Sequence, residues 1–348
     1  MRKIFMTMIV FMFAIVIAGC GKNAAEENGK ESEKSDNESE TTEISGTLSF
    51  YTSQPDADAQ ALVEAFQKKN PNVKVETFRS GTEEVISKIQ AEKQAGDIQA
   101  DVLLVADSVT FESLKEDDLL LSYQSPETKQ IPASFVDQDG TYTGTKVMAT
   151  ALVINTNEVK ELPDGWSVLT EKESKGKASM PSPFYSGAAA YNLGVITRQD
   201  SLGWDFYKDL KANEIGITKG NGGVLEAVAT GEKSYGIVVD FVVARAKKEG
   251  SPVELIYPKE GVPVITEPVG IMKNTKNEAA AKAFIDFVLS EEGQKLAAEL
   301  GYTPIREGIA APEGLKTLDE MNVLEANITE LYKAREEDKK QFGNIFGQ

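Results

Sequence analysis

The sequence of 348 residues contains no histidine and only one cysteine. Without histidine, the protein lacks the commonest general base and the commonest ligand of transition metals. A single cysteine allows neither an intramolecular disulfide nor a cysteine-based metal cluster. G-x-S-x-G and P-loop motifs are also absent, which argues against a serine hydrolase and a P-loop enzyme. The 55 acidic residues leave one enzyme class open, an extracellular hydrolase that uses paired carboxylates.

Positive charge is scarce, because 37 Lys and Arg residues stand against 55 Asp and Glu residues, a net charge of −18. So acidic a protein is expected to avoid nucleic acid and anionic membrane surfaces. The composition, 41% hydrophobic and 26% charged, is that of a soluble globular protein. At about 150 residues per domain, the length fits two domains.

The single cysteine follows an N-terminal segment that has the features of an export signal. Arg2 and Lys3 precede an apolar run over 4–17, which is too short to span a bilayer. The segment 17–20, Ile-Ala-Gly-Cys, resembles the bacterial lipobox, in which cleavage leaves the cysteine as an acylated N-terminus. We therefore expect residues 1–20 to be a lipoprotein signal peptide and Cys20 to carry the lipid; the alternative is a plain signal peptide with a chance cysteine.

Residues 21–45 carry almost no apolar side chains. They cannot bury enough surface to offset the entropy of ordering the chain, so we expect a disordered tether. Anchoring by several acyl chains is stable. The folded part would then lie outside the cytoplasm, on the outer face of the cell membrane in a Gram-positive cell or facing the periplasm in a Gram-negative one.

The folded part begins with alternating strand and helix patterns. Strands are predicted at 47–53, 72–81 and 100–108, and the apolar spacing of 57–69 and 82–96 is that of helices. The order β-α-β-α-β indicates an α/β fold with a parallel sheet that has helices on its faces.

A second series of the same kind follows, with strands predicted at 177–183, 215–221, 235–241 and 253–258. The chain is therefore expected to form two doubly wound α/β lobes, and 262–274 reads as a return crossing. The last helical region, at about 318–340, is polar and is expected to lie on the surface.

Several motifs resemble those of bacterial extracellular solute-binding proteins of ABC importers. Beyond the lipobox they are INTNEV (154–159), PSPFYSGAA (181–189), VATGEKSYGIVVDF (228–241) and the segment 282–308. The resemblance covers about 47–310 and is greatest to the branch that binds ferric ion, phosphonates such as 2-aminoethylphosphonate, or sugar phosphates. It implies a type II periplasmic-binding-protein fold that acts in transport and is not an enzyme, with the ligand between two lobes, an ABC permease as partner, and a monomeric state.

The resemblance also implies a hinge of two crossing segments, near 149–154 and 263–269. The expected division of the chain is lobe one at 46–149 and 268–310, lobe two at 150–267, and a C-terminal helical extension at 311–348.

Ligands of open parallel sheets bind beyond the carboxyl ends of the strands. Small, hydroxyl and acidic residues follow nearly every predicted strand, and they are the candidate ligand-binding residues: Thr52, Ser53, Ser80, Gly81, Asp107, Ser108, Ser186, Gly187, Ala188, Asn221 and Asp240. Several have a structural alternative as helix caps, either in a capping box or singly.

The resemblance assigns chemistry to part of this set. The positions that match Ser186, Gly187, Ala188 and Asn221 hold a small anion in ferric-ion binders. Those proteins carry two adjacent tyrosines where this chain has Asp240 and a phenylalanine, so no metal site and no cofactor are expected. The predicted ligand is an organic phosphate or phosphonate whose amine or hydroxyls contact Asp240; the alternative is ferric iron. Lys219 either helps to bind the anion or is a solvated surface lysine.

Overall fold

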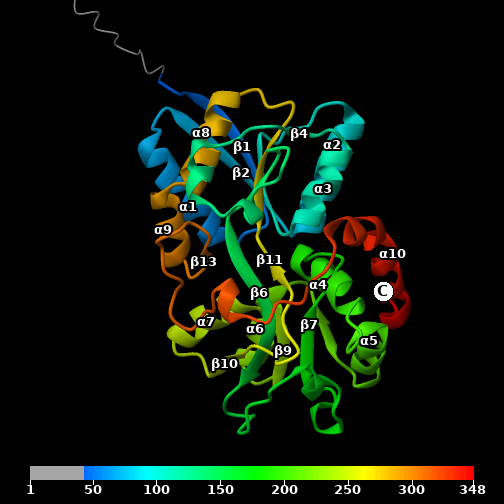
Figure 1. Ribbon diagram of the computed structural model, residues 1–348. Coiled ribbons are helices and arrows are strands. Elements are labelled where there is room, and N and C mark those ends of the chain that lie inside the picture. Colours follow the sequence, from blue (N-terminus) through cyan, green and yellow to red (C-terminus); the bar gives the residue numbers. More distant parts are fainter. Residues whose placement is uncertain (1–42) are drawn as a thin grey trace, which may run out of the picture. The chain divides into compact units, whose positions relative to one another are not determined.

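The computed structural model describes residues 43–348, which form two α/β lobes. Cys20 and most of the predicted tether (21–45) lie outside the described residues, so the lipobox and tether stay predictions. Figure 1 shows one lobe above the other, with the C-terminal helix beside both. The predicted fold class is confirmed, because each lobe contains its own mixed sheet with helices against it.

Lobe one is built on a sheet with the strand order β2-β1-β3-β12-β4, to which β5 is added beside β12. Its strands are β1 (Gly46–Thr52), β2 (Val73–Arg79), β3 (Val102–Leu104), β4 (Leu120–Leu121), β5 (Thr143–Gly144) and β12 (Pro268–Met272). The first three are parallel, as the β-α-β-α-β pattern predicts, and β12 returns antiparallel to β3.

The helices of lobe one cover both faces of this sheet. They are α1 (Asp56–Lys69), α2 (Thr82–Ala95), α3 (Ser108–Glu116), α8 (Glu278–Leu289) and α9 (Glu291–Glu299). On one face, Phe50 of β1 and Phe66 of α1 pack against Phe284 of α8, with ring centroids 4.9 and 5.0 Å from Phe284. On the other face, Val85 and Ile89 of α2 are fully buried. These two apolar layers fix where α2 and α3 begin.

Lobe two has the strand order β10-β6-β9-β7-β8, and β11 and β13 also pair with β6. Its strands are β6 (Lys146–Asn155), β7 (Ala178–Pro181), β8 (Gly216–Thr218), β9 (Tyr235–Val239), β10 (Val253–Ile256), β11 (Val264–Ile265) and β13 (Thr303–Pro304). All ten residues of β6 are buried, as expected for a central strand with both faces covered.

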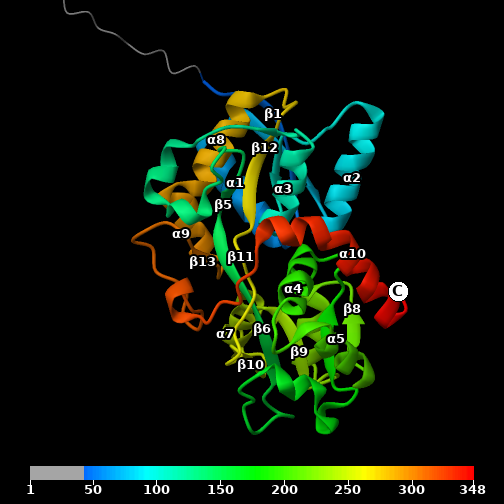
Figure 2. The ribbon, with the colours of Figure 1, turned by 45° about the vertical axis from the view of Figure 1, so that its right-hand side comes forward.

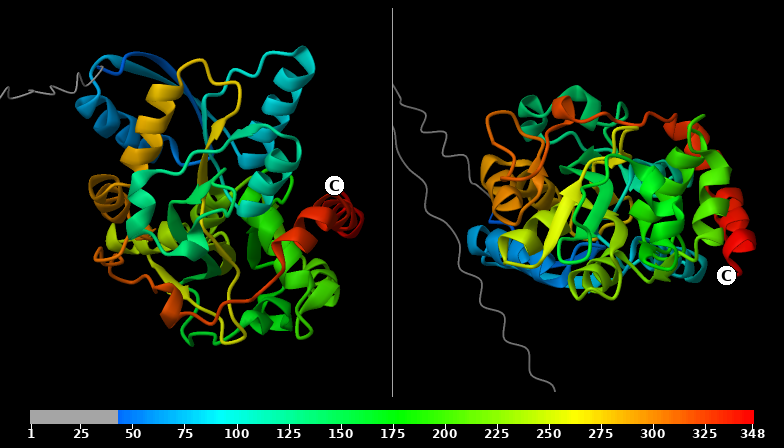
Figure 3. Two further views of the ribbon diagram at one scale, coloured as in Figure 1. Left: turned by 45° about the horizontal axis from the view of Figure 1, so that its top comes forward. Right: turned by 90° about the horizontal axis from the view of Figure 1, so that it is seen from below.

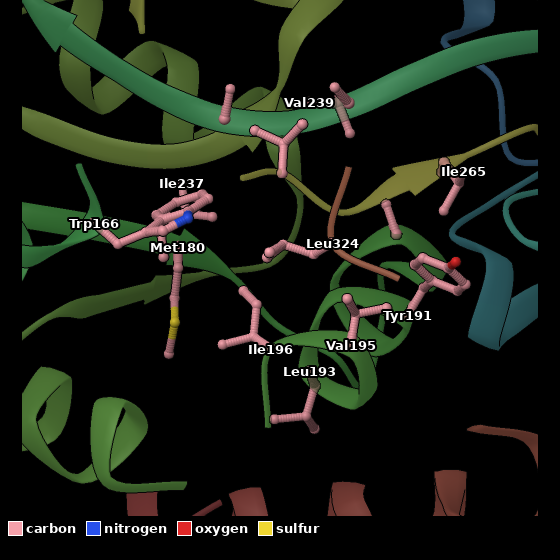
Figure 4. Close-up of a cluster of buried hydrophobic side chains, with 14 of the residues drawn as sticks. Trp166, Met180, Tyr191, Leu193, Val195, Ile196, Ile237, Val239, Ile265 and Leu324 are labelled. Atoms are coloured by element: carbon pink, nitrogen blue, oxygen red, sulfur yellow. The ribbon is translucent and has the colours of Figure 1, made fainter. Parts of the chain in front are cut away.

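The helices of lobe two are α4 (Gly187–Thr197), α5 (Gly203–Ala212), α6 (Asn221–Ala229), α7 (Asp240–Lys248) and α10 (Ile328–Phe346). The main core lies between the sheet and α4, where Trp166, Met180 and Leu193 are among the buried side chains (Figure 4). Short 3₁₀ turns occur in the connections of both lobes, at Pro126–Gln130, Ala133–Phe135, Trp166–Thr170, Lys172–Ser174 and Leu318–Glu320.

Two chain segments cross between the lobes, as Figure 2 allows the reader to follow. The first crossing lies between β5 and β6, at 144–146, a few residues before the predicted 149–154. The second lies between β11 and β12, at 265–268, within the predicted 263–269. Because β6 begins so early, its first residues pair with β11 and β13. The segment 303–304, predicted in lobe one, therefore pairs with the lobe-two sheet.

The C-terminal helix α10 lies on the outside of the molecule, as its polar sequence predicts, but one of its faces is packed. It packs against α3, α4 and α5, and Figure 3 shows it along the outer side of α5. Leu331, Phe342 and Phe346 are buried in the core of lobe two. The sequence did not show that charged residues of this helix pair with both lobes, including Arg335 with Asp107.

Candidate functional site

A cleft of about 380 Å³ lies between the lobes, and both lobes contribute to its lining. Lobe one contributes Ser53, Arg79, Gly81, Thr82 and Ala106, and lobe two contributes residues 185–188 and 219–223 among others. These residues follow the carboxyl ends of parallel strands, where the topology rule for open sheets places ligands.

Four helices begin at this cleft, α2 at Thr82, α4 at Gly187, α6 at Asn221 and α7 at Asp240, and the first three leave amides unpaired there. The first amides of a helix have no intrahelical acceptor, and the positive end of the helix dipole lies beside them. Within residues 43–348, the backbone amides of Thr82, Gly187, Ala188, Asn221 and Gly222 have no hydrogen-bond acceptor. The arrangement is therefore suited to bind an anion.

Side chains tie two of these helix tips together. The Ser186 hydroxyl accepts a hydrogen bond from the Ala189 amide at 3.3 Å and caps α4. The Asn221 side-chain amide donates to the same hydroxyl at 3.5 Å, and its carbonyl oxygen accepts from the Val239 amide at 3.2 Å. Asn221 is the first helical residue rather than the cap, which is Gly220. The tips of α4 and α6 therefore hold a fixed relative position.

The lobes touch beside the cleft, across the tips of α2 and α4. The Glu83 amide of lobe one donates a hydrogen bond to the Tyr185 carbonyl of lobe two at 3.3 Å. A Cβ atom on Gly81 would lie 2.6 Å from that carbonyl oxygen, and one on Gly187 would lie 2.7 Å from the Thr82 Cβ. Only glycine leaves room for this approach, so the structure is that of closed lobes.

Two cations approach the cleft from opposite lobes. The Arg79 guanidinium donates to the Gln54 carbonyl at 2.7 Å. The Lys219 ammonium lies 4.2 Å from the centroid of the Tyr185 ring and 3.1 Å from the Glu84 carboxylate. Lys219 therefore lies at the cleft and also pairs across the lobes, although its side chain is 67% exposed.

On the hinge side, the cleft is lined by a buried carboxylate, Glu267. It forms an ion pair of 2.5 Å with Lys146, and the Gln54 side chain donates to it at 3.4 Å. Glu267 has a φ of 37°, a conformation that a non-glycine residue adopts only under constraint. The Thr145 hydroxyl helps to hold it by donating to the Glu267 carbonyl at 2.7 Å.

Six of the eleven predicted ligand-binding residues line the cleft: Ser53, Gly81, Ser186, Gly187, Ala188 and Asn221. The other five lie outside its lining. Thr52 is fully buried and accepts a hydrogen bond from the Gln54 amide at 3.1 Å. Ser80 is next to the cleft, but its hydroxyl donates to Glu84 and does not form a capping box with Glu83, which was its structural alternative. Asp107 caps α3, which begins at Ser108, and pairs with Arg335.

Asp240 requires a correction, because it does not reach the cleft. Its carboxylate accepts hydrogen bonds from the Tyr257 hydroxyl at 3.0 Å and from the Phe241 amide at 2.8 Å, inside lobe two. Burial raises the pKa of Asp240 to about 7, against the smaller effect of these hydrogen bonds. The carboxylate that faces the cleft is Glu267, which the sequence analysis missed. Glu267 lies in a crossing segment rather than at a strand-to-helix junction, so the junction rule could not find it.

Arg79 and Thr82 were also missed, although both adjoin predicted residues at the end of β2. Among residues 43–348, no group of three or more His, Cys, Asp and Glu side chains is arranged to hold a metal ion. In the same part of the chain, no helix has the length and apolar character needed to cross a membrane.

The fold and the cleft define a class, that of two-lobed binding proteins. A solved structure of the periplasmic binding protein AfuA from Actinobacillus pleuropneumoniae, with fructose-6-phosphate bound, superposes with a TM-score of 0.80 at 24% identity, over 86% of this chain and 98% of that one. Iron-bound HitA from Pseudomonas aeruginosa gives a TM-score of 0.76 at 24% identity, over 85% and 99%.

Sequence comparison identifies the family. The family model described as "Bacterial extracellular solute-binding protein" matches residues 61–322, so the chain belongs to this family, and the predicted resemblance is confirmed. A probable ABC transporter periplasmic-binding protein of Sinorhizobium fredii is 26% identical over 75% of each chain. A putative 2-aminoethylphosphonate-binding periplasmic protein of Salmonella typhimurium is 24% identical over 72% of this chain and 74% of that one.

Proposed function

We propose that this protein is the solute-binding component of an ABC importer and that it captures a small phosphonate or phosphate ester. The observation that carries this proposal is the meeting of three helix tips, with their unpaired amides, at one cleft. A phosphonate or phosphate group has several acceptor oxygens, which can use amides from α2, α4 and α6 together. The names of relatives support the class, since they include binders of 2-aminoethylphosphonate and of a sugar phosphate.

The rest of the ligand would lie toward the hinge, where Glu267 takes the part that Asp240 had in the sequence-based hypothesis. A carboxylate pairs best with a cation, so a ligand that carries an amine fits this side slightly better than a sugar does. Lys146 already neutralises much of the charge of Glu267. Sugar hydroxyls, which need no net charge, therefore remain a close second.

Ferric iron is the competing ligand, because relatives and structural neighbours include iron binders. Two tyrosines, Tyr185 and Tyr302, line the cleft. The Tyr302 hydroxyl donates to Asp58 at 2.5 Å, and burial raises the pKa of this phenol well above its ordinary value. A raised pKa opposes the phenolate form that ferric iron binds, so Tyr302 argues against iron.

A thermal-shift panel of 2-aminoethylphosphonate, simple alkyl phosphonates, sugar phosphates and ferric citrate tests the proposal. A ligand at 100 times its Kd should stabilise the folded protein by about 2.7 kcal/mol. We expect phosphonates or phosphates to raise the Tm. A response to ferric citrate alone, with a tyrosinate-to-iron colour band, would replace the proposal by an iron-binding function. Turnover of a bound compound would indicate a hydrolase.

We also propose that Cys20 carries the lipid that anchors the protein to the membrane, where it would meet its permease. The support is the position of the only cysteine at the end of a lipobox-like segment. Replacing Cys20 by serine should release the protein or leave it unprocessed. A Cys20→Ser variant that stays in the membrane fraction with lipid attached, at the wild-type level, would contradict the anchor.

A further inference from the structure

We propose that α10 is an interlobe latch, which holds the two lobes closed in the absence of ligand, and that Arg335 is its key residue. The latch acts at the edge of the cleft formed by α2, α3 and α4, whereas the two chain crossings form the hinge. The proposal requires only that the lobes move about this hinge. It does not depend on which anion the cleft binds.

The first step is that α10 belongs to lobe two. The Phe342 ring is 6.0 Å from the Tyr207 ring of α5 and stacks on the Phe346 ring at 4.4 Å. Leu331 lies so close to α4 that a Cβ on Gly194 would be 2.9 Å from its Cδ2 atom. Such interdigitated apolar contacts keep the helix on lobe two when the lobes separate.

The second step is that the charged face of α10 is paired with lobe one. The Arg335 Nη1 atom donates to both carboxylate oxygens of Asp107 at 3.0 Å, and its Nη2 atom donates to Glu83 at 2.7 Å. The Lys339 ammonium is 2.8 Å from the other oxygen of Glu83. One guanidinium therefore joins two helices of lobe one, which a single ammonium cannot do with the same geometry.

The third step concerns burial and charge. The side chains of Arg335, Lys339 and Glu83 are 12%, 13% and 15% exposed, and that of Asp107 is fully buried. Two cations and two carboxylates thus meet in a nearly dry cluster, in which burial raises the pKa of Asp107 against the effect of Arg335. Lys339 also pairs with the exposed Glu336. Burial opposes the ionisation of Glu83, but Arg335 and Lys339 outweigh it and lower the pKa of Glu83. Removing one cation would leave a buried carboxylate without its partner, and opening the lobes would return it to water.

The fourth step connects the latch to the cleft. Glu83 lies in the first turn of α2, directly after Thr82, and its amide makes the hydrogen bond to Tyr185 of lobe two. Asp107 follows Ala106, which also lines the cleft, and has a φ of 70°, a constrained conformation for an aspartate. The latch thus holds the tips of α2 and α3 in the positions that they have in the closed cleft. Arg335 is a positioning residue, since it does not line the cleft itself.

The experiment measures the lobe separation directly, without ligand. The full chain carrying Cys20→Ser has no other cysteine. Spin labels can then be attached through Gln94→Cys on α2 and Asp209→Cys on α5, both of which are exposed. Pulsed electron paramagnetic resonance should give one short distance for this protein. In Arg335→Met we expect a second, longer distance and a fall of about tenfold in the ratio of closed to open molecules, as for the loss of one charge-assisted pair.

Arg198→Met is the matched control. Arg198 is an arginine at the end of α4 that pairs with Asp338 and Glu330 of α10, all within lobe two. Arg198→Met should leave the distance between the two spin labels unchanged, although it weakens the packing of the same helix, α10. Arg335→Lys keeps the positive charge but loses the guanidinium that binds Asp107 and Glu83 through two nitrogen atoms. It should give an intermediate ratio of closed to open molecules, and it serves as the test if Arg335→Met fails to fold.

Three outcomes would overturn the latch. The first is a ligand-free parent protein that is already open. The second is a wild-type distance distribution in both Arg335 variants, or in Arg335→Lys if Arg335→Met does not fold. The third is an equal opening in Arg198→Met, which would mean that any loosening of α10 has the same effect. Because no ligand is added, each of these results is independent of the thermal-shift panel that tests the proposed function.

Discussion

The two sides of the cleft are built from different chemical groups. On the helix-tip side, the groups available to a ligand are mainly backbone amides, such as those of Gly187 and Gly222. On the hinge side, the main polar group is one charged side chain, Glu267, which is already paired with Lys146. Backbone amides are neutral dipoles that do not titrate, and their positions follow from where helices begin. The carboxylate depends on its side-chain conformation, its partner and its ionisation.

This difference suggests a division of roles. The helix-tip side would bind any ligand with a compact anionic group, because backbone amides have little selectivity beyond charge and shape. The hinge side would select among such ligands by the group at their other end. The predictions below separate these roles, in order of their expected effect on binding.

Ser186→Glu should have the largest effect. Its carboxylate would lie at the α4 tip, where it would occupy the anion site and repel a phosphonate at a cost of about 4 kcal/mol, close to a thousandfold in affinity. The helix dipole tolerates a carboxylate there, so stability should change by about 1 kcal/mol or less. Calorimetric titration of the best ligand of the panel, with melting curves, measures both. Ser80→Glu, at a serine outside the cleft lining, is the control; binding within threefold of wild type in Ser186→Glu would return Ser186 to a capping role.

Glu267→Gln should separate the role of the hinge side of the cleft from that of the helix-tip side. A ligand with an amine should bind about tenfold to a hundredfold more weakly, since it loses a charge-assisted contact. A phosphonate without an amine should bind nearly as before. Because the substitution leaves Lys146 buried without its partner, the double variant Lys146→Met, Glu267→Gln controls for stability. Equal losses for both ligands would show that Glu267 has no selective role.

Gly187→Ala tests the approach of the lobes. Its new Cβ would lie 2.7 Å from the Thr82 Cβ and should keep the lobes from closing fully, which we expect to weaken binding about tenfold. The control is Gly222→Ala, which is in the same lining but whose Cβ would meet no atom within 4 Å. If titration gives the same affinity for both variants, the contact between the helix tips is not needed for binding.

Asp240→Asn should have almost no effect on binding, within about threefold, because Asp240 lies outside the cleft lining. It should instead change how stability depends on pH. The folded pKa of about 7 lies above the unfolded value of 3.8, so the folded state binds the extra proton and wild type loses stability as the pH rises from about 4 to 7. The loss amounts to about 2–4 kcal/mol and should be absent from the variant. Urea unfolding at pH 5 and pH 8 measures it; parallel pH profiles would contradict the raised pKa.

Much of the fold could be predicted from the sequence, because apolar periodicity decides which segments become buried strands and helices. The parallel order of β1, β2 and β3 follows from the alternation of strands and helices alone. The helix-tip side was also predictable, since Ser186 and Asn221 follow strands that the sequence predicts, β7 and β8. The first crossing was placed too late because β6 is buried throughout, and no residue within it marks where one lobe ends.

The hinge side and the contacts of α10 could not be predicted, because they depend on partners that are distant in the sequence. Asp240 looked like a cleft residue, but Tyr257 binds it inside lobe two. Arg335 looked like a solvated helix residue, yet its partners Asp107 and Glu83 lie 228 and 252 residues earlier in the chain. The side-chain pattern of a single helix cannot reveal such pairs.

The pairing of β6 has a consequence for how the chain reaches this structure. Along its ten residues, β6 pairs with β9, β10, β11 and β13, the last of which ends at Pro304. The sheet of lobe one is likewise interrupted until β12, at Pro268–Met272, is inserted between β3 and β4. A chain that emerges N-terminus first, from a ribosome or a translocation channel, therefore keeps unpaired strand edges in both lobes until its last quarter arrives. Such long-range pairing makes folding slow and leaves the edges open to aggregation. A chain cut before residue 268 would lack the strands needed to complete either sheet.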